Sequence, residues 1–394
     1  MKWFSYLKND SKNKINKLNQ INLINLPTYK QNEFLSYYNE LKLYFNNITN
    51  ITPNNTIQKD VEKWKHKYIG GNRSLENQNL DFQTIYLFDN QKIIFHHKKN
   101  NHSYENLLLK RIMTLFKFYN YDNKTEISVI TNNMNRRLNK QRSYNINQDL
   151  KIMKEKSIAN ISSGVTTSDG KLIVSRTEEL PKLLVHELIH LMGLDGNLFN
   201  PAHHHIRNSV DQLSNYYLNN FCVKKNIRSV AIESYTETLS NILNCMFFSM
   251  EIPNGNFKVF IETLELERQY SIYQTAKLLY FFGFNNFDEF FIQCSNDLNH
   301  NKRVFFTDTL YLDYTIIRSI IFYRFDDILS TLNISKNKFN IPNSSNNFYD
   351  KLLLIIDDTI NNNSEFKNIL NNYLTSFKSH KDLDIGYTCI DIKP

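Results

Sequence analysis

Glycine and proline are scarce in this chain, which has 9 Gly and 7 Pro among 394 residues. Collagen-like repeats and Pro/Gly-rich low-complexity segments are therefore excluded, because both need a far higher content of these residues. Asn, Lys, Ile, Tyr and Phe are abundant instead, as expected of an AT-rich genome. With 41% hydrophobic and 22% charged residues, the composition is that of a folded globular protein.

Cysteine is also rare, and its four positions form no CxxC pair: Cys222, Cys245, Cys294 and Cys389. Widely spaced single cysteines argue against a disulfide framework and point to a reducing compartment. We expect four buried thiols.

Long hydrophobic runs are missing as well. The first residues hold only a short apolar stretch before charge returns, which is too little for a signal-peptide core. The most apolar window, residues 272–284, is interrupted by Lys277, so no membrane span is expected. Together with the cysteine usage, this predicts a cytoplasmic protein.

The net charge of +8 would ordinarily suggest an anionic partner. The same codon bias raises the Lys content, however, and the basic residues are scattered along the chain. No nucleic-acid-binding motif accompanies them. The sequence therefore does not favour nucleic acid as a partner.

The hydrophobic patterns change along the chain. Residues 1–65 are Lys/Asn-rich with loose helical spacing, whereas alternation predicts strands at 84–88 and 92–96, 126–131, 165–167 and 171–174. From residue 179 the spacing is helical throughout, in segments 179–192, 206–222, 229–250, 258–282, 286–297, 311–332, 348–361 and 364–377. A sheet followed by helices predicts an α+β fold. We divide the chain into a helical region 1–80, a subdomain 81–200 with the sheet, and a helical subdomain 201–394.

An HExxH motif, His186-Glu187-Leu188-Ile189-His190, lies in the first helix after the sheet. Pro181 suits the start of that helix, Gly193 suits its end, and Thr177 or a neighbour is the expected cap. Residues four apart lie on one face, so both imidazoles can bind one zinc ion, with Glu187 beside them as general base for the attacking water. A structural or vestigial zinc site is the alternative, but such a site has no use for Glu187 as a base.

Two histidines leave a third zinc ligand to be found. The longer motif HExxHxxGxxH fails, because Gly196 occupies its last position and Asp195 stands one residue early. The helix predicted at 229–250 carries Glu233 and Glu237 four residues apart on one face. The run 203–205 is three adjacent histidines, which cannot all face one metal ion, and we interpret it as a surface run.

HExxH followed by a helix with Glu-x-x-x-acid resembles the gluzincin peptidases, a branch of the zincins. The resemblance implies that Glu233 is the third zinc ligand and that Glu237 orients His186 or His190. The gap of about forty residues after His190 is longer than in the best-known members. Glu237 as the ligand, or a ligand elsewhere, therefore stays open.

A looser resemblance, over roughly residues 80–394, is to uncharacterised HExxH proteins of large DNA viruses of eukaryotes. It is carried by segments 233–243, 265–274 and 387–390. It implies a viral protein located in the host cytoplasm or the virion. Within it, Tyr270 is expected as a catalytic residue that stabilises an oxyanion, with Arg268 beside it; a core tyrosine is the alternative.

Together these observations predict a zincin-like fold, with an N-terminal twisted mixed sheet packed on the HExxH helix and a mostly helical C-terminal region. The expected activity is zinc-dependent peptide-bond hydrolysis, endopeptidase rather than exopeptidase, on a polypeptide substrate. The strand before the motif, residues 171–176, is expected to offer its unpaired edge to an extended peptide. A virion or scaffold protein with a structural zinc site is the alternative; the oligomeric state is left open.

Overall fold

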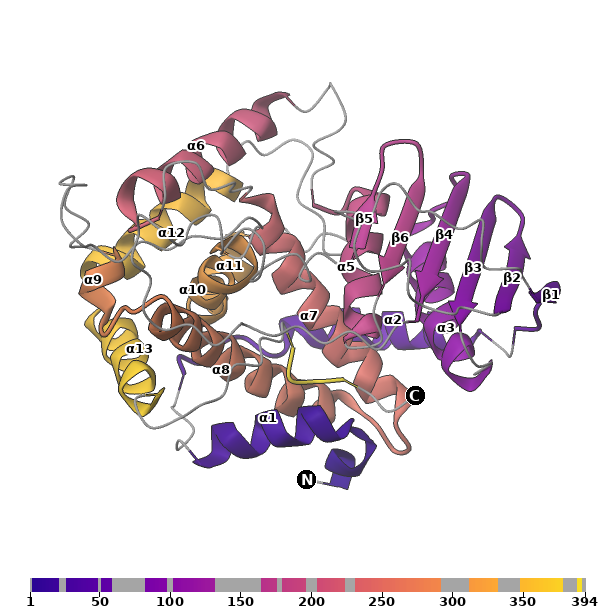
Figure 1. The fold of residues 1–394 in the computed structure, drawn as a ribbon, viewed down its shortest axis with the longest axis horizontal. Helices are drawn as coiled ribbons and strands as arrows, with labels where there is room; N and C mark the ends of the chain where they lie inside the picture. Colours follow the sequence, from indigo (N-terminus) through magenta and orange to yellow (C-terminus); the bar gives the residue numbers. More distant parts are fainter. Residues whose placement is uncertain are drawn as a thin grey trace.

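The computed structural model describes residues 2–20, 26–48, 51–58, 82–97, 102–131, 164–175, 179–195, 204–223, 231–291, 312–331, 348–377 and 388–391. A mixed sheet occupies one side of the molecule and helices fill the other, as Figure 1 shows. The predicted α+β class is therefore confirmed.

The sheet has six strands in the order β1-β2-β3-β4-β6-β5: β1 (Asn55–Gln58), β2 (Phe82–Phe88), β3 (Gln91–His97), β4 (Thr125–Ile130), β5 (Gly164–Thr166) and β6 (Lys171–Ser175). The strands β3, β4 and β6 are parallel, and the outer pairs are antiparallel. Both predicted hairpins are confirmed. Asp89 and Gly170 supply the positive φ angles, 22° and 80°, that their tight turns require.

Helix α3 (His102–Tyr119) joins β3 to its parallel neighbour β4, and the sequence analysis did not identify it. Parallel strands cannot be joined by a tight turn, so a crossover of this length is needed. Its buried residues include Leu108, Ile112 and Leu115, which repeat at helical spacing. The pattern was therefore present in the sequence.

The predicted substrate edge at residues 171–176 is wrong. Strand β6 is paired on both sides, with β4 and with β5. The hairpin places its first strand outermost, so β5 is the last strand on this side of the described sheet. Residues 164–166, and not 171–175, offer main-chain groups to an added strand.

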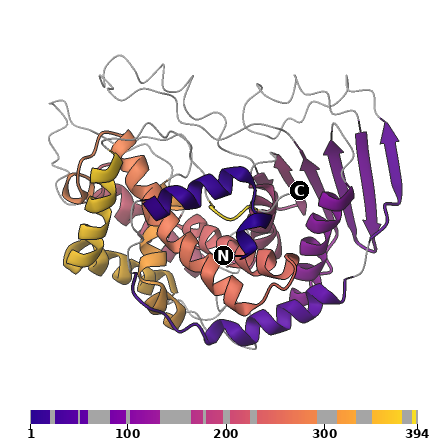
Figure 2. The same cartoon turned by 90° about the horizontal axis from the view of Figure 1, so that it is seen from below.

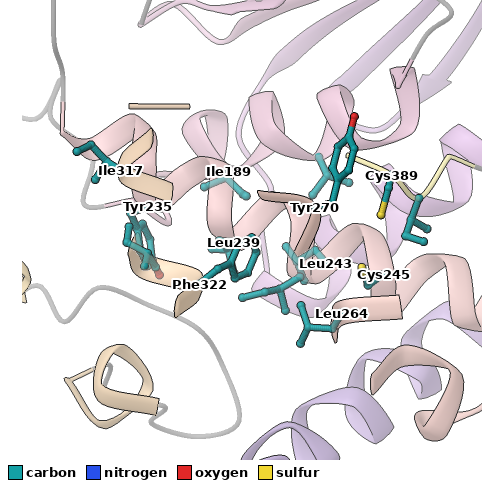
Figure 3. Close-up of a cluster of buried hydrophobic side chains, with 14 of the residues drawn as sticks. Ile189, Tyr235, Leu239, Leu243, Cys245, Leu264, Tyr270, Ile317, Phe322 and Cys389 are labelled. Carbon is teal, nitrogen blue, oxygen red and sulfur yellow. The ribbon is translucent and has the colours of Figure 1, made fainter. Parts of the chain in front are cut away.

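The helical part of the structure comprises η1 (Lys2–Tyr6), α1 (Asn9–Gln20), α2 (Glu33–Asn46), α5 (Leu180–Met192), α6 (His204–Asn220), α7 (Ile232–Glu251), α8 (Phe257–Phe281), α9 (Phe287–Phe291), η4 (Leu312–Ile317), α10 (Arg318–Tyr323), α11 (Phe325–Thr331), α12 (Phe348–Asn362) and α13 (Ser364–Ser376). Helix α7 packs against both α5 and α8. Figure 3 shows part of the resulting core, with Ile189 of α5, Leu239 and Leu243 of α7, and Leu264 of α8. None of the described helices is long and apolar enough to cross a membrane.

Both ends of the chain pack onto the same helices. Helix α1 lies along α8, and α2 contacts α3 and α7, as Figure 2 shows from below. Residues 388–391 are anchored by Glu267, whose Oε1 accepts hydrogen bonds from the backbone N–H groups of Cys389 and Ile390, each at 2.8 Å. Cys222, Cys245 and Cys389 are buried free thiols, as predicted; Cys294 lies outside the described residues.

Candidate metal centre

Helix α5, which carries the HExxH motif, is buried along most of its length, from Leu180 to Ile189. It packs against β5, β6, α3 and α7. Pro181 lies in its first turn, and Gly193 ends it at φ 69°, with the N–H of Leu194 donating to the carbonyl of Ile189. The start differs from the prediction in that Glu179 makes no side-chain cap and instead pairs with Lys14. Thr177 lies outside the described residues.

Three residues of α5 form a stripe at intervals of four: Lys182, His186 and His190. This stripe faces Glu233 and Glu237 of α7. Lys182 pairs with Glu237, His186 contacts both carboxylates, and His190 contacts Glu233. Residues later in α5 contact residues earlier in α7, so the two helices run antiparallel here.

The two histidines and Glu233 meet in a triangle. The Nε2 atoms of His186 and His190 are 3.2 Å apart, and each lies 3.2 Å from Oε2 of Glu233. Ligand atoms held about 2.0–2.1 Å from a tetrahedral zinc ion are about 3.3 Å apart, so these spacings suit three corners of a zinc site. The donor set, two imidazoles and one carboxylate, also suits catalytic zinc, which keeps its fourth position open. A search of the described part of the chain for His, Cys, Asp and Glu side chains close enough together to hold a metal ion finds these three residues.

Each histidine has a carboxylate at its other nitrogen. Nδ1 of His186 lies 3.0 Å from Oε2 of Glu237, and Nδ1 of His190 lies 2.5 Å from Oδ2 of Asp195. A carboxylate at Nδ1 favours the proton there, which leaves the Nε2 lone pair for a metal ion. Glu237, the expected orienting residue, therefore lies beside His186. Asp195, which the sequence analysis considered only for the longer motif, has the same position beside His190.

Glu237 is surrounded by positive charge. Its Oε1 contacts the ammonium of Lys182 and lies 2.9 Å from Nη1 of Arg318, and all three residues are at most 2% exposed. Burial acts to raise the pKa of Glu237, but Lys182 and then His186 and Arg318 hold it well below its ordinary value. This carboxylate is thus kept ionised by cations of the protein itself.

Glu233 has histidines as its charged partners. Burial acts to raise its pKa, but His190 and His186 beside the carboxylate hold it well below the ordinary value. The pKa of His190 is correspondingly raised, because Glu233 and Asp195 outweigh the opposing effect of burial. His190 and Glu233 are also the more exposed members of the triangle, with side chains 13% and 16% exposed against 5% for His186. The site therefore opens to solvent on their side.

Glu187 contacts strand β5. Its Oε2 accepts a hydrogen bond of 2.7 Å from the hydroxyl of Thr166. Only 6% of the residue is exposed, and this burial raises its pKa, although His186 and His190 oppose the shift. A buried carboxyl with a raised pKa beside such a candidate site has the properties of a general base or acid.

Tyr270, the expected oxyanion donor, belongs to a different group of residues. Its hydroxyl accepts a hydrogen bond from the Gln274 amide, its ring stacks on Tyr273, and Lys14 lies 5.9 Å from the ring centre. Arg268 is likewise occupied, with Glu265 and two backbone carbonyls as partners. Both side chains are buried in the core (Tyr270 is labelled in Figure 3), and the structure does not bring Tyr270 into the triangle.

A tyrosine that does border the triangle is Tyr314, on η4. Its ring lies edge-on to the ring of His186, with the centroids 5.8 Å apart. Neither this residue nor the contacts of Lys182, Asp195 and Arg318 with the site were predicted from the sequence. Lys182 had a signal, since it stands four residues before His186; Tyr314 and Arg318 had none. Among the three histidines 203–205, His203 and the side chains of the other two lie outside the described residues.

The chain is similar to a viral protein. An uncharacterised protein of Acanthamoeba polyphaga mimivirus is 26% identical over 250 residues, which cover 61% of this chain and 56% of that protein. This similarity supports the predicted viral origin but gives no information about the activity of this chain. No protein-family model and no solved structure matches.

The contact between Asp195 and His190 allows a test. We expect Asp195→Asn to weaken zinc binding by about 10- to 100-fold, because loss of the charged partner makes the ligand imidazole less basic and less firmly oriented. Titration with a competing chelator measures this affinity. Asp211→Asn, on the exposed face of α6, is the matched control and should leave the affinity unchanged. Equal affinities for Asp195→Asn and wild type would mean that Asp195 does not orient the ligand.

Proposed function

We propose that this protein is a zinc-dependent peptidase, with His186, His190 and Glu233 as zinc ligands and Glu187 as general base. The observation that carries the proposal is the triangle of Nε2, Nε2 and Oε2 atoms with 3.2 Å sides. Its spacing and donor types suit tetrahedral zinc, and the HExxH motif places a carboxylate next to two of the ligands.

The charges around the histidines support a divalent ion. Four carboxylates lie around the pair, those of Glu187, Glu233, Glu237 and Asp195, while Lys182 and Arg318 supply two buried positive charges. With these groups ionised and the two histidines neutral, as metal ligands must be, two negative charges are left over. Buried charge is costly unless it is compensated, and a divalent cation would compensate this excess in place of protons on the histidines.

In the proposed reaction, zinc supplies Lewis-acid polarisation of the scissile carbonyl and of the attacking water. Glu187 takes the proton of that water and passes it to the leaving nitrogen. Glu237 and Asp195 keep the two imidazoles oriented. Tyr314, which borders His186, takes the role of oxyanion donor that the sequence had suggested for Tyr270.

The substrate in this proposal is an extended polypeptide. Strand β5 is the last described strand on the side of the sheet nearest α5, and it packs against that helix. An extended peptide that added to this edge would gain main-chain hydrogen bonds independent of its side chains.

Metal analysis of the purified full-length protein, combined with a cleavage screen on a broad peptide library, tests the proposal. We expect one zinc ion per chain and cleavage that a chelator abolishes and added zinc restores. Full zinc content with no cleavage in the library would favour the structural-zinc alternative, and absence of bound zinc would refute the proposal.

A further inference from the structure

The side chain of Glu187 fills the space beside a glycine of the edge strand β5. A β-carbon placed on Gly164 would lie 2.7 Å from Cγ and 2.8 Å from Cδ of Glu187. Distances under 3.0 Å essentially never occur between such atoms, so any larger residue at this position displaces the Glu187 carboxylate. Because Gly164 has no side chain, the carboxylate of Glu187 can occupy this space.

Thr166 holds the same carboxylate from two residues further along the strand. Its hydroxyl lies 2.7 Å from Oε2 and 3.1 Å from the backbone carbonyl oxygen of Glu187. One hydroxyl proton serves both acceptors, and the shorter distance favours the carboxylate. Residues two apart point to the same face of a strand, so Gly164 and Thr166 both face α5, while Val165 points to the other side.

We propose that β5 positions the general base, with Gly164 leaving room for the Glu187 side chain and Thr166 fixing its carboxylate by a hydrogen bond. Both are positioning residues, since they act through Glu187. This inference rests on the proposed function. It also ties the base to the strand along which an extended substrate is proposed to lie.

The two residues act in different ways, so their variants have different expected effects. Gly164→Ala should lower kcat by about 100-fold, because displacing a reacting group by about 1 Å costs on that order. Thr166→Val should lower kcat by roughly 10-fold through loss of a hydrogen bond to a charged group. Thr166→Ser keeps the hydroxyl and should remain within about 2-fold of wild type. Thr375→Val, on the exposed face of α13, is the matched control for Thr166→Val.

Steady-state kinetics and zinc content of the full-length variants form the first test. We expect the losses in kcat with KM within about 3-fold and one zinc per chain, because neither residue touches the three proposed ligands. A purely structural role would lower the folded fraction and would not be rescued selectively by Thr166→Ser. Wild-type kcat in both Gly164→Ala and Thr166→Val would overturn the inference.

A second measurement does not depend on activity. In urea unfolding, Thr166→Val and Glu187→Ala should couple by roughly tenfold in the unfolding equilibrium constant, as contacting residues do. If the wild-type protein cleaves no peptide but the coupling is found, the proposed function is wrong, whereas the contact between Thr166 and Glu187 is confirmed. If the enzyme is active but the two variants are additive, the inference about β5 is wrong while the proposed function remains.

Discussion

Replacing Glu187 with Gln is expected to lower peptide hydrolysis by about 10²- to 10⁴-fold while zinc content and thermal stability stay near those of wild type. Gln keeps the size of the side chain and an oxygen that can accept the Thr166 hydrogen bond, but it removes the proton acceptor. Glu187 is not a member of the ligand triangle, so the metal should remain. Activity assays, metal analysis and thermal melting measure the three quantities.

Glu126→Gln is the matched control for this substitution, since the Glu126 side chain is 44% exposed and pairs with Lys92. It should leave all three quantities unchanged. A Glu187→Gln protein that still cleaves would show that the base is misassigned. A protein that loses its zinc on this substitution would place Glu187 among the ligands instead.

Zinc affinity should separate the two glutamates of α7. Glu233→Ala is expected to weaken zinc binding by more than about 100-fold, beyond the 10- to 100-fold that an orienting residue contributes, because it removes one corner of the triangle. Glu237→Gln should stay within that smaller range, since Glu237 contacts the triangle only at the far nitrogen of His186. Chelator competition on both full-length variants decides between them.

The choice of Gln at position 237 matters. Glu237→Ala would leave the buried cations Lys182 and Arg318 without their carboxylate, and breaking a buried charge pair costs about 3–5 kcal/mol of stability. Misfolding would then be mistaken for loss of a ligand, so unfolding curves should accompany the affinities. If Glu237→Gln strips the metal and Glu233→Ala does not, the assignment is reversed. If neither does, the resemblance to gluzincins is misleading.

Much of the local structure was predictable because its signals are local. Apolar spacing located α6, α7, α8, α12, α13 and the strands β2 to β6 within a few residues, whereas the segment predicted at 311–332 is divided into η4, α10 and α11. Turn residues such as Gly170 fixed the hairpins, and Gly193 fixed the end of α5. The motif itself places His186 and His190 on one face, since four residues make about one helical turn.

Other features depended on how the elements pack. Helical periodicity indicated which face of α8 carries Tyr270, but not which element packs against that face. In the structure this face contacts Lys14 and the core and does not contact the histidines. Alternation located residues 171–175 as a strand without showing that β4 and β5 would pair with both of its edges.

The sequence by itself determined the α+β class, the HExxH helix and the two glutamates that had to be compared. Only the tertiary structure distinguished the surroundings of those glutamates, by placing Glu233 against both Nε2 atoms and Glu237 against Lys182, Arg318 and the far side of His186. The reason is that spacing within a helix fixes which residues share a face, whereas the meeting of His190 with a residue 43 positions away depends on the axial register of α5 on α7. That register is set by packing along both helices, which no local pattern encodes.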